Sequence, residues 1–572
     1  MDASTVVAGI DVGNSTTEIV LVDADSRRPV AWDRTPTRGS KGSPESLDTA
    51  AALLRRVTKR ADVVVDRLGV APLHPVRTMA AVIPEPRAST GRLVACVGGS
   101  DTVGNVGFAV GRPVRVDDDP PRDGDVVALV SSSFGFRSAV QRVTQWQAAG
   151  VSVVAVVCAD DEAVLLSNRL AGGIPVVDGV AVERLSQGSG VDQVAVEVAP
   201  LGHPLVRLTD PMVLISSLGL GDAEQDVAVT VASRLVDARA AAVGVTRDQP
   251  ARSSDSDAAT SWVQWTDGRR STFHDAHPLI REGPPGQVSR FHVARPDSDP
   301  AGLAAADLVT VRLDQVGDAA LVRRGTVGDH AFVISSLSPP GDGGQPAQGL
   351  RDRTGLDVQV ASSEAAAARR GALSTPGVPP DGAVLDLGGG TLDLVVGDDA
   401  VVGAGAGELL TVSVAELLGV PRGAAEWAKR GPAMRMDSPH VLVAEDGSRS
   451  FAQRRPPADA IGSLVVAGPA GWLAVSRHLS ASEWRALRLS LKREVLGVGV
   501  RRLLAAGLTL PSGLVVVGGP AGDDETVRVL ADVLGSGMAV GRGAVAEVLG
   551  HRYAVAHGLA LMVLDGADAR RA

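Results

Sequence analysis

The chain is organised around one stretch, Leu385-Asp386-Leu387-Gly388-Gly389-Gly390-Thr391-Leu392-Asp393. Apolar runs flank it, at 383–385 and 394–396, as is typical of a β-hairpin with a glycine-rich turn. Successive glycines accept positive φ and carry no Cβ, so peptide N–H groups can converge on phosphate oxygens. Asp386 and Asp393 at the two ends are suited to a hydrated Mg²⁺ beside those phosphates. An ordinary structural hairpin would show the same pattern, so this stretch alone does not decide the function.

A second copy of the pattern lies near the N-terminus, in Ile10-Asp11-Val12-Gly13-Asn14-Ser15-Thr16-Thr17-Glu18. Aligned residue by residue, the two copies place Asp11 on Asp386, Gly13 on Gly388, Thr16 on Thr391 and Glu18 on Asp393. Two acid-glycine-threonine-acid hairpins far apart in the sequence predict a duplicated lobe, with one phosphate-binding loop contributed by each half.

A third stretch, Leu514-Val515-Val516-Val517-Gly518-Gly519-Pro520, predicts a buried strand that enters a Gly-Gly turn. Gly518 and Gly519 would let the backbone approach a flat ligand such as a nucleoside. Together the three stretches resemble the phosphate-1, phosphate-2 and adenosine motifs of the superfamily of actin, sugar kinases and heat-shock chaperone ATPases. The resemblance implies an α/β fold, an actin-like (ribonuclease H-like) two-lobed ATPase, that binds ATP or ADP with Mg²⁺.

Composition excludes several other classes of protein. The 572 residues are enough for three or four domain-sized units, and 45% apolar with 21% charged residues is typical of a soluble globular protein. With 56 Lys+Arg against 66 Asp+Glu, the net charge of −10 argues against nucleic acid as the main partner. No Walker-A sequence occurs, and the ten histidines show no metal-ligand spacing.

Cys96 and Cys158, the two cysteines, are far apart and predict neither a disulfide framework nor a zinc or iron–sulfur site. The N-terminus lacks the basic and apolar segments of a signal peptide, and the longest apolar runs are too short to cross a membrane. We therefore expect a cytoplasmic protein with no membrane partner.

Local patterns predict several elements outside the three motifs. Ser43–Ala61 should be a helix with Ser43 as its N-cap, and the Asp-Gly dipeptide at 267–268 should make a hairpin turn. A strand at 126–130, a helix at 136–149 and a strand at 151–157 form a βαβ unit, which predicts a small parallel sheet in its own domain. Residues 247–300 have a loop or linker composition, and the last helix is expected at about 544–563, followed by a frayed polar tail.

The chain also resembles the large (alpha) subunit of diol/glycerol dehydratase reactivating factors. The matching stretches are Ala8 to Ser15, Leu165 to Leu170, Ile174 to Asp178 and, more weakly, Gly405 to Gly407, Glu445 to Ser448, Gly541 to Gly543 and Ala554 to Gly558. The likeness covers most of the chain and thins at 247–360, where a long helix of the family is shortened. It implies four parts: residues 1–83, the first part of the ATPase lobe; 84–245, an inserted swivelling α/β domain; 246–357, an ATPase, linker and smaller-insert region; and 358–572, the ATPase part with the second phosphate loop and adenosine motif.

Such factors are chaperone-like ATPases that use ATP to release damaged cobalamin from an inactivated adenosylcobalamin-dependent diol or glycerol dehydratase. The resemblance implies a small-subunit partner, hence a hetero-oligomer, and the dehydratase as the protein acted on. It assigns Asp11 and Asp386 to the hydrated metal and the attacking water. The implied ATP-binding residues are Gly13, Asn14, Ser15, Thr16, Gly388, Gly389, Gly390, Thr391, Gly518 and Gly519. Glu364, on a connecting helix, is either a supporting carboxylate or a solvated acid at a helix start, and Lys492 lies on a helix that approaches the nucleotide in related ATPases.

A second metal site is also implied by the family resemblance, at Thr102, Asp161 and Asp178. Asp161 follows the strand that ends near Val157, and Asp178 follows the apolar run 174–177. Strand ends in one sheet can bring two carboxylates together, and an oxygen-only set of ligands suits Mg²⁺ or Ca²⁺. The alternative is a pair of exposed loop aspartates.

Three other functions are compatible with an actin-like fold. A small-molecule kinase would need a catalytic carboxylate for a substrate hydroxyl, and the insert after residue 84 fits that poorly. A filament-forming protein would polymerise with ATP. An activator of acyl-CoA dehydratases would bind an iron–sulfur cluster through cysteines, an arrangement that Cys96 and Cys158 do not offer.

Overall fold

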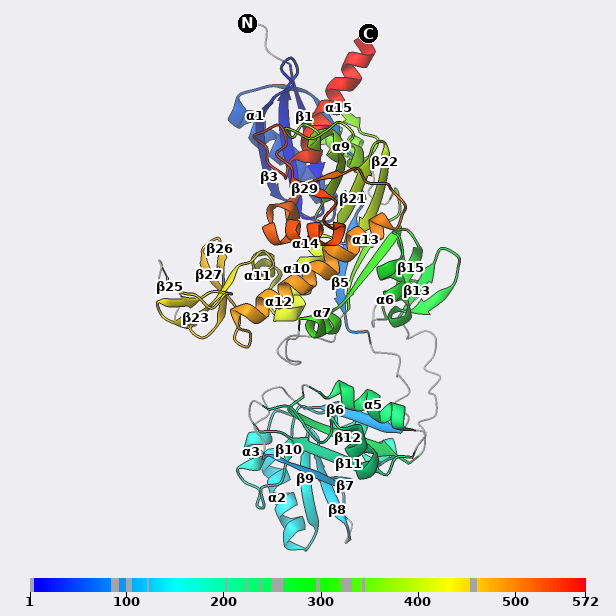
Figure 1. Cartoon of the computed structure of the whole chain (residues 1–572), viewed down its shortest axis with the longest axis vertical. Coiled ribbons are helices and arrows are strands. Elements are labelled where there is room, and N and C mark those ends of the chain that lie inside the picture. The colour runs from blue at the N-terminus through cyan, green and yellow to red at the C-terminus, as the bar shows by residue number, and fades with distance from the viewer. Residues whose placement is uncertain are drawn as a thin grey trace. The chain divides into compact units, whose positions relative to one another are not determined.

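The computed structural model describes residues 5–83, 92–98, 105–120, 123–200, 203–221, 224–236, 238–247, 261–294, 299, 301–320, 332–341, 345–452 and 460–571. The chain divides into two compact units (Figure 1). The first combines residues 1–83, 256–322 and 327–572, and the second combines 84–255 with 323–326. No helix in the described part of the chain is long and apolar enough to cross a lipid bilayer.

Two five-stranded sheets of the first unit have the same topology, which confirms the predicted duplication. In each sheet three antiparallel strands in sequence are joined to two parallel ones. The first sheet, in the order β3-β2-β1-β4-β19, contains β1 (Val6–Val12), β2 (Thr16–Asp23), β3 (Pro29–Pro36), β4 (Val65–Val70) and β19 (Asp357–Val360). The second, in the order β22-β21-β20-β28-β29, contains β20 (Ala383–Leu387), β21 (Thr391–Val396), β22 (Asp399–Ala404), β28 (Gly513–Gly518) and β29 (Ala539–Arg542).

Helix α15 (Ala554–Arg571) packs against β1 and against α9 (Glu364–Ala372), as Figure 1 shows. Glycines permit backbone contact here: a Cβ on Gly9 would lie 2.0 Å from the Ala556 carbonyl oxygen. At the helix crossing, a Cβ on Gly558 would lie 1.8 Å from the carbonyl oxygen of Ala367. Valines from both sheets join α15 in one buried apolar cluster, so this helix is part of the core that holds the two halves together.

The remaining elements of the first unit surround these sheets. A three-stranded sheet contains β17 (Asp307–Arg312), β18 (Phe332–Leu337) and β5 (Val76–Ala81), and a four-stranded one contains β13 (Trp262–Trp265), β14 (Arg270–Thr272), β15 (Val288–His292) and β16 (Leu303–Ala304). A third small sheet contains β23 (Ala433–Ser438), β24 (Val441–Val443), β25 (Arg449–Phe451), β26 (Leu464–Gly468) and β27 (Gly471–Ser476). The helices are α1 (Pro44–Ala61), α6 (Phe273–Glu282), α7 (Leu313–Ala319), α8 (Pro346–Thr354), α10 (Gly407–Leu418), α11 (Arg422–Ala428), α12 (Ala481–Lys492), a π-helical turn (Arg493–Gly497), α13 (Val498–Leu504) and α14 (Asp524–Leu534).

The second unit is built on a seven-stranded mixed sheet in the order β10-β9-β8-β7-β11-β12-β6. Its strands are β6 (Leu93–Val97), β7 (Gly107–Arg115), β8 (Asp125–Val130), β9 (Ser152–Cys158), β10 (Val176–Val177), β11 (Val191–Val198) and β12 (Ala240–Thr246), and its helices are α2 (Phe136–Ala148), α3 (Ala163–Ser167), α4 (Pro211–Leu218) and α5 (Gln225–Arg234). The βαβ unit of β8, α2 and β9 is present and parallel, as predicted.

Several local predictions are confirmed. The α1 helix starts after Ser43, whose hydroxyl accepts a hydrogen bond from the Ser46 N–H. The turn at Asp267-Gly268 joins β13 to β14, with Gly268 at φ +85°. Both motif hairpins form, with Asp11 opposite Glu18 and Asp386 opposite Asp393.

Three predictions were wrong. The sheet of the second unit is larger than a small parallel one, because antiparallel β11, β12 and β6 extend it beyond β7. The described residues 261–294 form β13, α6 and β15 around buried aromatic side chains and are no linker. The last helix begins at Ala554, ten residues after the predicted start. It cannot begin earlier because Val545 and Gly550 pair in a β-bridge, and Ala546 and Glu547 take left-handed φ of +45° and +65°.

The α9–α15 crossing predicts a large cost for one added methyl group. Gly558→Ala must force the two helices apart, and we expect it to lower the free energy of unfolding by about 3 kcal/mol. The matched control is Gly317→Ala in α7, where a Cβ meets no atom within 4 Å and the change should be neutral or gain about 0.5–1 kcal/mol. Denaturant unfolding of both variants measures the difference, and equal stability would show that the contact at Gly558 can relax.

Candidate functional site

A cleft of about 1820 Å³ in the first unit brings the three sequence motifs together. Its lining includes Asp11, Gly13, Asn14, Ser15, Thr16, Glu364, Asp386, Gly388, Gly389, Gly390, Thr391, Gly518 and Gly519. Every residue predicted for the nucleotide site therefore lies on this one cleft. The residues predicted for the second metal site belong to the other unit.

The two hairpin turns close with the same hydrogen bond. The Gly13 N–H donates to the Thr16 carbonyl oxygen at 3.0 Å, and the Gly388 N–H donates to the Thr391 carbonyl oxygen at 2.9 Å. Since the turns are equivalent and their strands have the same register, the structure repeats the same loop in both halves.

The two loops also lie against each other. A Cβ on Gly389 would be 2.7 Å from the Ser15 hydroxyl oxygen, and one on Gly390 would be 2.5 Å from the Asn14 amide nitrogen. The Asn14 amide oxygen accepts a hydrogen bond from the Val76 N–H at 3.0 Å, which fixes the first loop. Peptide N–H groups at the start of α10 fix the second loop, because the Glu408 N–H donates to the Gly389 carbonyl at 2.7 Å.

The turn after β28 requires glycine at its first position. Gly518 has φ +88°, and a Cβ there would lie 2.4 Å from a carboxylate oxygen of Asp386. The Arg552 guanidinium covers the next residue, since a Cβ on Gly519 would be 3.2 Å from it. The backbone of this turn therefore passes directly beside the Asp386 carboxylate.

Carboxylates converge at the base of the cleft. Glu18, Asp386 and Asp393 are buried, while Asp11 and Glu364 are half-buried. Burial, followed by the charges of Glu364 and Glu18, raises the pKa of Asp386 to about 7. Burial also raises the pKa of Glu18 to about 7, although the Arg552 guanidinium, 3.5 Å away, lowers it. The pKa values of Asp11 and Asp393 are raised as well, again mainly by burial.

One buried ammonium group lies in this cluster. Lys41, with a side chain only 2% exposed, forms an ion pair of 2.6 Å with Glu364. Burial lowers the pKa of Lys41, but Glu364 and Asp11 more than offset this effect, so the pKa is raised. Glu364 stands at the first position of α9, and its carboxylate lines the cleft and pairs with Lys41 there.

The donor set of the cleft suits a hydrated divalent cation. Carboxylate oxygens are the ligands that Mg²⁺ prefers, and one Asp393 oxygen is buried without a hydrogen-bond partner. In the part of the chain that the structure describes, no three acidic, histidine or cysteine side chains are grouped as direct ligands of one ion. The residues therefore fit an ion held largely through water by Asp11 and Asp386. Such an ion would neutralise charge on phosphate oxygens.

Sequence reasoning missed Lys41, Glu408 and Arg552. Lys41 lies in Gly39-Ser40-Lys41-Gly42-Ser43, a glycine-rich loop before a helix start, which is a signal that could have found it. Glu408 accepts a hydrogen bond from the Ser15 hydroxyl at 3.3 Å and pairs with Arg422. Arg552 and Glu408 had no local signal, because their partners are distant in the sequence.

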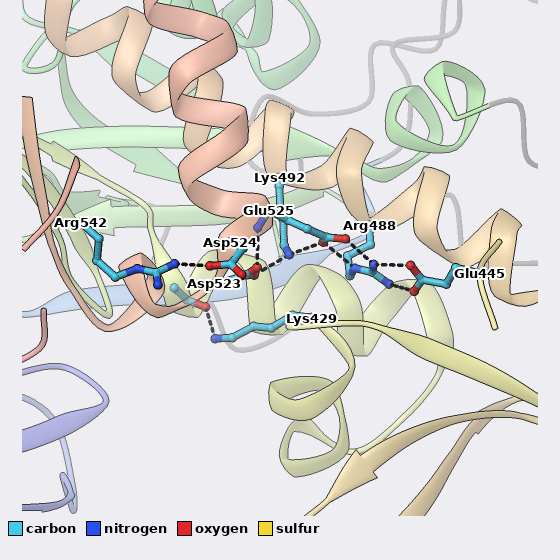
Figure 2. Close-up of polar contacts among 9 residues, drawn as sticks. Lys429, Glu445, Arg488, Lys492, Asp523, Asp524, Glu525 and Arg542 are labelled. Carbon is cyan, nitrogen blue, oxygen red and sulfur yellow. Dashed lines mark hydrogen bonds and ion pairs between the residues drawn. The ribbon is translucent and has the colours of Figure 1, made fainter. Parts of the chain in front are cut away.

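A buried ion-pair network borders the cleft (Figure 2). Arg488 and Lys492 of α12 are each 1% exposed at the side chain, and both bind Glu525, at 2.6 Å each. Arg488 also binds Glu445 at 2.8 Å, and Lys492 binds Asp523 at 2.5 Å. Burial opposes ionisation, but the two cations lower the pKa of Glu525 to about 2. Lys492 is therefore a structural link between α12 and the turn after β28.

The second predicted site is described only in part. β10 runs parallel to β9, and their register places Asp178, the residue after β10, beside Cys158, the last residue of β9. Asp161 lies three residues after Cys158, at the same end of the sheet. Asp178 is 2% exposed and accepts a hydrogen bond from the Ala163 N–H at 3.0 Å, whereas Asp161 is exposed. Thr102 lies outside the described residues.

Comparison with known proteins identifies the family. Two family models match the chain: the diol dehydratase reactivase ATPase-like domain at 343–563 and the DD-reactivating factor swiveling domain at 96–249. The propanediol dehydratase-reactivating factor large subunit of Citrobacter freundii is 28% identical, over 97% of this chain and 98% of its own length. The chain belongs to the diol dehydratase reactivase family.

One further relative and one solved structure also match this chain over nearly its whole length. The diol dehydratase-reactivating factor large subunit of Klebsiella michiganensis is 26% identical, over 97% of this chain and 98% of its own length. A solved structure of diol dehydratase-reactivating factor in nucleotide-free form superposes with a TM-score of 0.63 at 24% identity, covering 98% of this chain and 100% of that one. These findings confirm the predicted family and the two-lobed actin-like fold with an inserted domain.

The raised pKa of Asp386 predicts that this residue destabilises the nucleotide-free protein at neutral pH. The unfolded carboxyl ionises near pH 4, whereas the folded one resists ionisation up to about pH 7, so stability falls as the pH rises between these values. Asp386→Asn removes this loss, and we expect it to raise the free energy of unfolding at pH 8 by at least about 1 kcal/mol, with no gain at pH 4.

Thermal unfolding in chelator at pH 4, 6 and 8 measures this effect. The exposed Asp381→Asn, just before β20, is the matched control and should change nothing at any pH. A lower stability of Asp386→Asn at pH 8 would contradict the argument.

Proposed function

We propose that this chain is the large subunit of a reactivating factor. It hydrolyses ATP and thereby releases damaged cobalamin from an inactivated adenosylcobalamin-dependent diol or glycerol dehydratase. The observation that carries the proposal is the pair of equivalent hairpin loops, one from each half, on a single carboxylate-rich cleft. The match to the relatives over nearly the whole length of both chains supports the dehydratase as the protein acted on.

Phosphoryl transfer requires a protein mainly to position phosphates, metal and water. In our proposal the β- and γ-phosphates of ATP bind the N–H groups of the loops Gly13–Thr16 and Gly388–Thr391, and adenosine lies beside Gly518 and Gly519. Asp11 and Asp386 hold hydrated Mg²⁺ and orient the attacking water. Since Asp386 and Gly518 are in contact, a nucleoside bound at this turn would place its phosphates close to that carboxylate.

We further propose that a divalent cation, Mg²⁺ or Ca²⁺, binds Thr102, Asp161 and Asp178 and helps to hold the small subunit in a hetero-oligomer. Two carboxylates at adjacent strand ends leave coordination positions for a carboxylate from a partner. Asp178 already accepts a hydrogen bond from the start of α3. A substitution that removes its charge must therefore keep a hydrogen-bond acceptor at this position, as Asn does.

Reactivation of a dehydratase tests the proposed function directly. A glycerol-inactivated dehydratase should recover activity when it receives this chain, its small subunit, ATP, Mg²⁺ and adenosylcobalamin. Recovery should require hydrolysable ATP. Recovery without this chain, or none with all components present, would count against the proposal.

Asp386→Asn should reduce ATP hydrolysis at least ~100-fold, by analogy with the loss of other single catalytic groups. A phosphate-release assay measures the rate, with Asp381→Asn as the folded control of unchanged rate. Because the Asn variant is expected to be more stable than the wild type, a loss of rate cannot come from unfolding. Wild-type turnover would remove Asp386 from the mechanism.

The double variant Asp161→Ala/Asp178→Asn should weaken small-subunit binding at least ~10-fold and leave basal ATP hydrolysis within a few-fold of normal. Chelator should weaken the wild-type complex in the same way, which calorimetry can measure. Full affinity in the double variant, or a selective loss of ATP hydrolysis, would show that the metal has been placed wrongly.

A further inference from the structure

Lys41 lies in the loop between β3 and α1, and its side chain reaches into the cleft. The flanking glycines, Gly39 and Gly42, take φ of +69° and +89°, which other residues rarely adopt. The Lys41 side chain is 2% exposed, and its ammonium group donates to a Glu364 carboxylate oxygen at 2.6 Å. A buried lysine in an ion pair with the first residue of α9 is therefore a fixed part of the cleft.

The charges around Lys41 are strongly unbalanced. Four carboxylates beside the two loops line the cleft: Asp11, Glu18, Glu364 and Asp386. Asp393 is buried behind them, within electrostatic range of Glu364, Asp386 and Lys41. Arg552 pairs with Glu18, at the side of the cleft where the turn after β28 lies. The charges of Glu364, Asp11 and Asp393 act on Lys41, and its own charge acts on Asp11, Asp386 and Asp393. The Lys41 ammonium is thus the cation that Asp11, Glu364, Asp386 and Asp393 share.

We propose that Lys41 is an internal counter-ion that keeps a divalent cation out of the cleft until nucleotide arrives. This inference rests on the proposed function, in which Asp11 and Asp386 hold the hydrated metal. An ammonium group beside a +2 ion is repelled strongly where water is scarce. The phosphates of a nucleotide add enough negative charge for both cations to be accommodated, so metal binds together with ATP and not before it.

A purely structural role for the Lys41–Glu364 pair, joining the loop to α9, predicts a different result. Loss of such a link would lower stability without changing the affinity for metal. Binding of Mn²⁺ in the absence of nucleotide distinguishes the two roles, because it reports the charge of the cleft without requiring ATP hydrolysis.

The experiment titrates Mn²⁺ into the full-length chain without nucleotide and follows free Mn²⁺ by electron paramagnetic resonance. All samples carry Asp161→Ala/Asp178→Asn, which removes the candidate metal site of the other unit. Lys41→Met should bind Mn²⁺ at least ~10-fold more tightly than the background protein. Lys41→Arg, which keeps the charge, should bind like the background.

Lys429→Met is the matched control. Lys429 is a half-buried lysine on the cleft, with a side chain 14% exposed. Its partner Glu426 also pairs with Arg430, at 2.5 Å, so the charge of Glu426 stays compensated in Lys429→Met and Mn²⁺ affinity should not change. Lys41→Gln, which retains a hydrogen-bond donor for Glu364, replaces Lys41→Met if that variant does not fold. Equal Mn²⁺ affinity in the uncharged Lys41 variants and the background, or an equal gain in Lys429→Met, would overturn the proposal.

ATP hydrolysis by the wild-type chain is measured in parallel with Mg²⁺. If the chain does not hydrolyse ATP, the proposed function is contradicted, whereas the comparison of Mn²⁺ affinities still tests the counter-ion role of Lys41. Hydrolysis together with unchanged Mn²⁺ affinity in Lys41→Met would fail the counter-ion inference alone.

Discussion

Backbone contact between α9 and α15 is the constraint on which the cleft depends. The contact is possible only because Gly371 and Gly558 face carbonyl groups of the opposite helix. Each helix begins at the cleft: α9 with Glu364, and α15 two residues after Arg552. The crossing therefore fixes one acidic and one basic group relative to both loops, since α15 also packs on β1 and in the core between the sheets.

A cleft that gathers carboxylates without enough cations is unfavourable for the isolated protein. Burial raises the pKa values of Asp11, Glu18, Asp386 and Asp393, and neighbouring acids raise those of Asp11, Asp386 and Asp393 further. The charge of Lys41 opposes the effect at Asp11, Asp386 and Asp393. Functional sites commonly retain such unfavourable charge because the ligand supplies what is missing. Under the proposed function, the missing charge is that of a metal ion that arrives with phosphate.

Local sequence patterns were enough for the hairpins, the cap at Ser43 and the turn at Gly268, because each depends on neighbouring residues. They also placed the predicted loop residues on one cleft, since the duplicated motif implies a duplicated sheet. Long-range contacts could not be predicted. The strand β7 contains two glycines, Gly107 and Gly111, and was not predicted. The burial of Lys492 depends on Asp523 and Glu525, which are more than thirty residues away in the sequence.

The contact between the two loops has a consequence for how the duplicated halves have diverged. Ser15 and Asn14 in the first loop occupy the space that side chains on Gly389 and Gly390 would need. Two copies that both carried side chains would collide there, and two copies of glycine alone would leave a gap. Symmetry between the halves is therefore broken at the point where they meet: the first loop carries the side chains, and the second leaves the space that they fill.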